Sequence, residues 1–182
     1  MSILTAEKTG TYTLDPSHSR VGFVARHAMV TKVRGAFGDF AGTANVDVEN
    51  PSASSVDLTI QVASIDTGSA DRDGHLKSSD FFDVETYPTI RFVSTDVARD
   101  GDEWTIAGDL TIKDVTKPVT VVFTEGGAAT DPFGNERIGF EGSVVVNRKD
   151  WGLTWNAALE TGGVLVSEKV TLEFDISAIK NA

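Results

Sequence analysis

Apolar and polar residues alternate through most of this chain, and a period of two residues is typical of β-strands with one buried face. The clearest run carries apolar side chains at Val56, Leu58, Ile60 and Val62. Comparable runs follow one another along the chain and are separated by short turns, such as Asp100-Gly101. Turns this short connect antiparallel neighbours, so the pattern predicts an all-β chain of about eight to ten antiparallel strands.

The extended stretch from residue 33 to residue 50 contains a change of phase. Phe37 is out of step with the alternation that starts at Phe40, and three glycines lie nearby, at Gly35, Gly38 and Gly42. Small residues and bends that recur in one strand are typical of a barrel corner. A closed barrel of about eight strands and a sandwich of two sheets both satisfy this periodicity.

One segment, Ser69–Pro88, has helical character. Ser69 can cap the start of a short helix, in which Leu76 is almost the only large apolar residue. The adjacent aromatic residues Phe81 and Phe82 follow, and the chain then returns to an extended conformation. We interpret the segment as a lid over the opening of the β structure. The alternative is a crossover connection whose phenylalanines plug the end of the core.

Length, charge and composition restrict the class of protein. A chain of 182 residues predicts one domain at residues 12–182, after a flexible N-terminal tail at residues 1–11. The formal net charge of −11 disfavours nucleic acid and anionic membrane surfaces as partners. The absence of cysteine excludes disulfides, thiolate metal sites and cysteine nucleophiles.

No targeting or membrane-spanning segment is recognisable. The first residues offer only Ile3 and Leu4 before Glu7 and Lys8, whereas a secretory signal needs about 7–15 apolar residues in a row. No run approaches the ~20 apolar residues of a membrane-spanning helix. We therefore expect a cytoplasmic protein without an integral membrane segment.

Several segments together resemble the YceI family of lipocalin-like β-barrel proteins. The matching segments extend from about Tyr12 to Ile176 and read YTLDPSHSRVGFVARH, VRGAFGDFAGT, ASIDTGSADRDGHLKSSDFFDVETYPTIRF, GDLTIKDVTKPV and DPFGNERIGFEGSVVVNRKDWGLTWN. The resemblance implies a closed antiparallel barrel of eight strands with a short helical lid and an apolar tunnel. It also implies a carrier of long-chain amphiphiles such as polyprenyl chains, isoprenoid quinones or fatty-acid derivatives. A homodimer is a further implication. Many members are periplasmic.

The three histidines offer little support for catalysis or metal binding. Their spacing matches no compact metal motif, so we expect no metal site, no cofactor and no catalytic residues. We place His27 at the inward end of a strand and His75 on the lid, where both can hydrogen-bond a ligand headgroup. The alternative is that local groups satisfy them, with Asp71 as the partner of His75.

Other chemistry is equally unsupported by motifs. The sequence contains no GxSxG, GxGxxG or P-loop pattern. Cationic side chains can bind a pyrophosphate, but in this acidic chain we interpret them as partners of surface carboxylates, at Arg20, Arg26, Arg72 and Lys77.

These observations predict the binding of a polyisoprenoid or isoprenoid quinone without chemical transformation. The alternatives are an enzyme that acts on such a lipid and a structural module whose own side chains fill the core. The residues that we expect to contact the lipid are Phe23, His27, Phe37, Phe40, Ile60, Val62, His75, Leu76, Phe81, Phe82, Phe92, Trp104, Phe140, Trp151 and Trp155.

Overall fold

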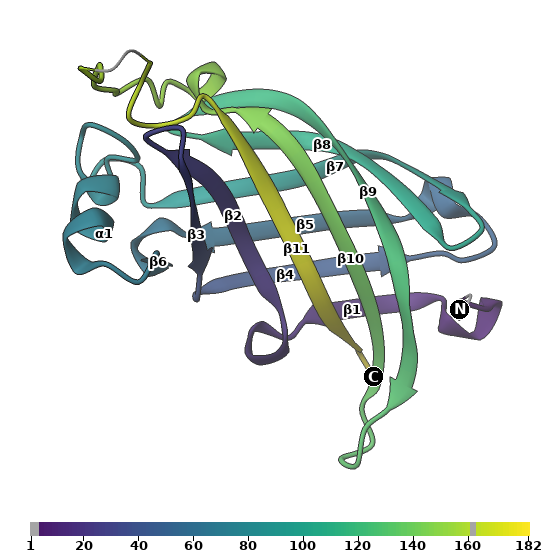
Figure 1. Cartoon of the computed structure of the whole chain (residues 1–182). Coiled ribbons are helices and arrows are strands. Elements are labelled where there is room, and N and C mark those ends of the chain that lie inside the picture. The colour runs from purple at the N-terminus through teal and green to yellow at the C-terminus, as the bar shows by residue number, and fades with distance from the viewer. Residues whose placement is uncertain (1–3, 161–162) are drawn as a thin grey trace.

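The strands form one antiparallel sheet that closes on itself. In the computed structural model, which describes residues 4–160 and 163–182, β1 pairs with β4 along one edge and with β11 along the other. Figure 1 shows the resulting barrel, which excludes the two-sheet sandwich. Its strands are β1 (Gly10–Leu14), β2 (Arg20–His27), β3 (Thr31–Phe37), β4 (Phe40–Val46), β5 (Ser55–Gln61), β6 (Ile65–Asp66), β7 (Thr89–Asp100), β8 (Glu103–Ile112), β9 (Val115–Thr130), β10 (Glu136–Asn147) and β11 (Lys169–Lys180).

Three consecutive pairs of these strands act as single strands with a break. The first pair is β1 and β2, which both pair with β11. The second pair is β3 and β4, of which β3 pairs with β2 and β4 with β1. The third pair is β5 and β6, of which β5 pairs with β4 and β6 with β3. With β7 to β11 they make the predicted closed barrel of eight strands. Short 3-10 helices occur at η1 (Ala6–Lys8), η2 (Pro16–His18), η3 (Pro51–Ala53), η4 (Val62–Ser64) and η5 (Arg148–Trp151).

The change of phase between Phe37 and Phe40 is such a break. Phe37 ends β3 and Phe40 begins β4, and both side chains are buried. The bend at Gly38 changes which alternate positions face inward, as the glycine pattern predicts. The hairpin predicted at Asp100-Gly101 is also confirmed, since it joins β7 to β8 with Gly101 at a φ of +62°.

Trp151, Leu153 and Trp155 alternate in the sequence as the residues of a short strand would, but no strand forms there. Residues Arg148–Trp151 are the 3-10 helix η5, and residues 152–160 and 163–168 form no strand beyond isolated bridges. Trp151 and Leu153 are nevertheless buried, because this segment folds over one end of the barrel. The large apolar residues alternate here because the loop is packed against the core, not because the segment pairs with a strand.

The helix lies where the sequence predicts it. α1 spans Ala70–Lys77, and the Ser69 hydroxyl accepts a hydrogen bond of 3.3 Å from the backbone N–H of Arg72. Figure 1 shows α1 at one end of the barrel, beside β3 and β6. In the part of the chain that the structure describes, no helix is long and apolar enough to cross a bilayer.

The segment for which we predicted a flexible tail makes defined contacts from Leu4 onward. Leu4 is buried, and its backbone N–H donates to the Glu125 carboxylate at 2.8 Å. The same carboxylate accepts from Arg99 Nη2 and Trp104 Nε1, both at 2.8 Å. This buried carboxylate thus joins β7, β8, β9 and the N-terminal segment at one end of the barrel.

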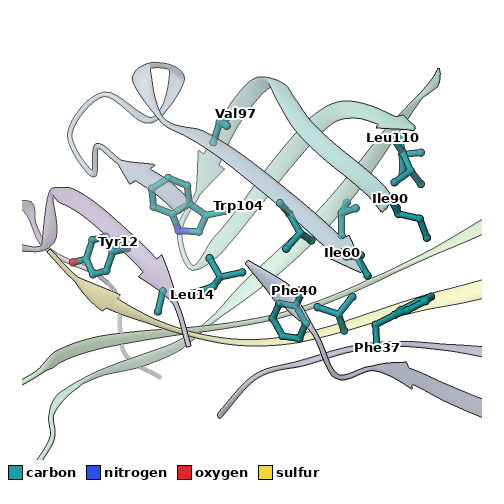
Figure 2. Packing of buried hydrophobic residues seen from close by; sticks show 14 of the residues in the cluster. Tyr12, Leu14, Phe37, Phe40, Ile60, Ile90, Val97, Trp104 and Leu110 are labelled. Atoms are coloured by element: carbon teal, nitrogen blue, oxygen red, sulfur yellow. The ribbon is translucent and has the colours of Figure 1, made fainter. Parts of the chain in front are cut away.

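The apolar core lies inside the barrel. Figure 2 shows side chains from several strands directed toward this shared interior, among them Leu14, Phe40, Ile60, Trp104 and Leu110. The alternation recognised in the sequence therefore separates the inside of the barrel from its surface.

A cluster of charged residues fastens the seam at which β11 meets β1. Arg137 on β10 donates to Asp131 Oδ2 at 2.7 Å, to Asp15 Oδ2 at 2.8 Å and to the Ser177 hydroxyl at 3.1 Å. Hydrogen bonds from Arg137 hold the pKa of Asp15 well below its ordinary value and lower that of Asp131 to about 2. The ionised carboxylates are therefore the form that stabilises the fold.

We expect Arg137→Gln to lower the free energy of unfolding at neutral pH. We also expect this free energy to fall less steeply in the variant than in the wild type as the pH is lowered. A carboxyl group with a lower pKa in the folded protein than in the unfolded chain stabilises the fold at any pH above its unfolded pKa. This stabilisation is lost as the pH falls through the pKa that the group has in the folded protein. The wild type should therefore lose stability as the pH falls from 3.8 toward about 2, and the variant should lose less. Urea unfolding at a series of pH values measures this difference.

The matched control is Arg91→Gln, which breaks an ion pair with Asp57 between two largely exposed side chains. Exposed pairs contribute little to stability, so this variant should resemble the wild type. Equal acid dependence in Arg137→Gln and the wild type would show that the cluster does not fasten the seam.

Candidate functional site

The end of the barrel beneath α1 encloses an apolar cavity of about 170 Å³. Side chains from β2, β3, β5 and β7 to β11 form its wall, and Leu76, Phe81 and Phe82 of the Ser69–Pro88 segment close it. The lining is apolar except at Arg148, and an apolar cavity of this kind accepts apolar guests. The segment is therefore a lid whose side chains form part of the cavity wall.

A second apolar cavity of about 100 Å³ adjoins the first, toward Trp104. Leu58 lines both cavities. Phe174 lines the larger cavity and Phe123 the smaller, with their ring centroids 5.8 Å apart, so this pair lies at the junction. The two cavities follow one another inside the barrel, and we call them together the channel.

Three phenylalanine rings are packed against glycines of neighbouring strands, which keeps them close to the channel wall. Phe23 lies opposite Gly35, and Phe123 lies opposite Gly142. Phe92 covers Gly108 in the same way, from a diagonal position. A Cβ atom at any of these glycines would collide with the facing ring. The missing side chains therefore leave space for the rings beside the backbone, and the interior stays open.

Arg148 is the one charged residue among the described residues that line the larger cavity. Its guanidinium is buried and donates to the backbone carbonyls of Leu153, Val166 and Ser167. Burial lowers the pKa of Arg148, and the negative charge of Glu168 partly opposes this. An arginine stays protonated at neutral pH, so a positive charge with two further N–H groups lies at the lid end of an apolar channel.

The lid closes over the barrel through an aromatic cluster. The His75 ring contacts Phe81 and Trp155 edge to face, with centroids 5.1 and 4.6 Å apart. His75 Nε2 lies 2.8 Å from Asp80 Oδ2, so its partner is a local carboxylate, but not the predicted Asp71. The cluster joins α1 to the irregular segment after η5.

The predicted lipid-binding residues fall into three groups. Those that line the larger cavity are Phe23, Phe37, Ile60, Leu76, Phe81, Phe82, Phe92 and Trp151. Those that line the smaller cavity are Trp104 and Phe140. Five lie outside both linings: Phe40 and Val62 are buried elsewhere in the core, His75 and Trp155 belong to the lid cluster, and the exposed His27 lies at the end of β2.

The inward position predicted for His27 is wrong, because the inward alternation of β2 ends before its last residues, which are exposed. His18 lies 2.9 Å from Asp15 Oδ2, far from the lid histidine in the chain. Within residues 4–160 and 163–182, no group of histidine and carboxylate side chains could hold a metal ion.

Sequence reasoning missed Arg148 and considered four other cations instead. Two of these bind the backbone of neighbouring loops or strands, since Arg20 donates to Gly35 O and Arg72 donates to Thr67 O. Arg148 follows β10 directly and lies in a segment that carries the family resemblance, but that segment did not single it out as a binding residue. Its burial arises only when the chain near Leu153 and Val166 folds over it, and no periodicity encodes that contact.

A closed eight-stranded antiparallel barrel with an apolar channel and a helical lid defines a lipocalin-like barrel. The model of the YceI-like domain matches residues 12–178. The chain therefore belongs to the YceI family.

Relatives and solved structures agree with this assignment. Protein YceI of Escherichia coli O157:H7 is 43% identical over 136 residues, which cover 75% of this chain and 71% of the relative. BcnA of Burkholderia cenocepacia has a TM-score of 0.79 at 27% identity, with 90% of this chain and 98% of BcnA covered. A polyisoprenoid binding domain from Saccharophagus degradans has a TM-score of 0.70 and 15% identity, with 96% and 100% covered, and shows the same fold.

We expect Gly142→Ala to narrow the channel. The added Cβ would lie 2.7 Å from the Phe123 ring and 2.9 Å from Val122 O, so the ring must move toward the interior. Binding of an apolar fluorescent probe such as parinaric acid should weaken by about ten-fold or more, the scale of one methylene in a tight apolar site. Fluorescence titration measures the affinity.

Gly139→Ala is the matched control on the same strand, because its Cβ would come no nearer than 3.7 Å to any atom. Thermal unfolding of both variants establishes that they are folded. If the two variants bind the probe equally well, the glycines do not set the width of the channel.

Proposed function

We propose that this protein binds a long-chain apolar amphiphile, a polyisoprenoid or an isoprenoid quinone, inside the barrel and carries or sequesters it. The observation that supports this proposal most directly is the channel itself. Two adjoining cavities are lined almost wholly by apolar side chains, and a lid covers the end of the larger one. A structural module whose own side chains fill the core would have no such space.

The energetics of burial favour a lipid held mainly by its tail. Each CH2 group transferred from water contributes roughly 0.8 kcal/mol. A long isoprenoid chain thus has a gross burial term that exceeds the practical ceiling of about 20 kcal/mol on noncovalent affinity, so the costs of ordering and desolvation offset part of it. Few polar anchors are needed. Selectivity should then depend on the length and headgroup of the ligand more than on the chemistry of its tail.

Arg148 is the group best placed to select the headgroup. Its guanidinium lies at the lid end of the larger cavity, with three of its five N–H groups already bound to backbone carbonyls. The remaining N–H groups can donate to a quinone carbonyl or to a phosphate oxygen. We propose this residue, in place of His27, as the polar contact beside the lid.

One solved structure with the same fold supports an isoprenoid as the ligand. The Saccharophagus degradans domain with the same fold is described as polyisoprenoid binding. The family match extends over nearly the whole chain and includes both the lid and the strands that form the channel. A homodimer, expected from the family resemblance, is a further proposal that light scattering of the purified protein would test.

Lipid extraction provides the direct test. Protein purified without detergent should release a long-chain isoprenoid into organic solvent, detected by mass spectrometry. Leu58→Trp, which places an indole where the two cavities meet, should reduce the recovered lipid by about ten-fold, since one methylene already matters in a tight apolar site. Gln61→Trp adds the same indole at an exposed position of β5 and should retain the lipid.

Overpacking costs about 1–3 kcal/mol, so thermal unfolding must show that Leu58→Trp is folded. Absence of any lipid above that in a control protein purified alongside, or full retention by folded Leu58→Trp, would contradict the proposed function.

We propose binding rather than catalysis because, among the described residues, no histidine or carboxylate lines either cavity. A bound polyprenyl lipid should therefore be recovered chemically unchanged after prolonged incubation with the protein. A new product that the wild type forms, and that the His27→Ala, His75→Ala double variant does not, would instead indicate an enzyme. Chromatography of the extracted lipid distinguishes the two outcomes.

A further inference from the structure

Exposed apolar side chains gather where the β2–β3 turn meets the loop before β11. Met29 and Val30 in the turn expose 64% and 74% of their surface, and Val164 in the loop exposes 38%. The Met29 sulfur lies against Gly163, where a Cβ atom would collide with it, so turn and loop form one surface. We call these three residues the apolar tip. Apolar side chains gathered in one place indicate an interaction site more than scattered ones do.

Backbone hydrogen bonds fix the conformation of the apolar tip. The Ala28 N–H donates to Leu165 O at 2.7 Å and the Ser167 N–H donates to Arg26 O at 3.1 Å, while the Arg26 N–H donates to the Ser167 hydroxyl at 2.9 Å. Ala28 and Met29 have φ values of +51° and +63°, which residues other than glycine seldom adopt. The surrounding contacts therefore hold a strained turn in which Met29 and Val30 face solvent.

Four cations surround a hollow on the outer face of the barrel, next to the apolar tip. They are Arg26, Lys32, Arg34 and Lys169, and all four side chains are exposed. Glu173 lies on the same hollow, and the nearby Glu168 is bound to Lys149 at 2.7 Å. In the described part of the chain, none of the four cations forms an ion pair. The protein carries a net charge of −11, so this cluster is a local reversal of its charge.

The apolar tip lies at the lid end of the channel. Ala25 and Val166, which line the larger cavity, are close in sequence to the tip residues Met29 and Val164. Trp155, in the segment that leads to the tip, contacts the lid through His75. Figure 1 shows the β2–β3 turn and the loop before β11 together, toward the end that α1 covers.

We propose that the apolar tip and the four cations dock the lid end of the barrel on a lipid bilayer that contains anionic lipids. The apolar side chains enter the interfacial layer while the cations contact lipid phosphates. This inference deepens the proposed function, because it places the channel beside the source of its ligand. Three side chains at a protruding turn are far too few for a stable protein–protein interface, whereas interfacial docking needs only such a tip with charges behind it.

Vesicle flotation tests this docking surface. The wild type should bind vesicles of phosphatidylcholine with phosphatidylglycerol, bind those of phosphatidylcholine alone more weakly, and dissociate as salt is added. Lys32→Gln with Lys169→Gln should weaken binding by about five-fold per cation. Met29→Ser with Val30→Ser should weaken it by about ten-fold or more. The control is Phe133→Ser, which removes a phenylalanine that is 89% exposed. It lies in the turn between β9 and β10, at the end of β10 that is remote from the lid.

Docking is overturned if the wild type does not bind the anionic vesicles, or if the two double variants bind as well as Phe133→Ser does. It is also overturned if light scattering shows a dimer that Met29→Ser with Val30→Ser dissociates, since the tip would then join two copies of the chain. Thermal unfolding identifies variants that fail to fold. Lipid extraction remains a separate measurement: a protein that releases no isoprenoid but docks on vesicles contradicts the proposed function alone, and the converse result contradicts docking alone.

Discussion

The pairing of β1 with β11 is the constraint on which the rest of this structure depends. It covers a short register, from Tyr12 opposite Lys180 to Leu14 opposite Ala178, yet it converts an open sheet into a closed barrel. An open sheet would leave two rows of backbone N–H and C=O groups without partners. Closure satisfies them and gives the chain an interior. The cluster around Arg137 fastens the same seam from β10.

An interior lined with so many aromatic side chains would ordinarily fill itself. It stays open because three phenylalanine rings lie on glycines, which use space beside the backbone rather than at the centre of the barrel. Kinks such as that at Gly38 allow the strands to curve enough for this arrangement. The glycines of this barrel therefore keep the cavity open and also allow the backbone to bend.

The polar groups at the two ends of the barrel have different roles. At one end, the buried Glu125 carboxylate accepts hydrogen bonds from Leu4, Arg99 and Trp104, and it joins the N-terminal segment to three strands. At the other end, Arg148 is buried beside the channel and retains N–H groups beyond those that bind carbonyls. The first arrangement stabilises a closed end. The second leaves a cation where a ligand headgroup can reach it, beneath a lid and beside an exposed apolar turn.

Most of the strands, the capped helix and most of the inward-facing side chains could be predicted from the sequence, because alternation, Asp-Gly turns and a Ser cap are local signals. The eight-stranded barrel also followed from segments that resemble a known family. Local patterns left open whether the sheet closes, and they did not indicate that Trp151 and Leu153 belong to a loop, that His27 is exposed or that Arg148 is buried. The reason is physical: closure and burial depend on contacts between residues far apart in the chain, such as Leu14 with Ala178 or Arg148 with Val166, and no periodicity records these contacts.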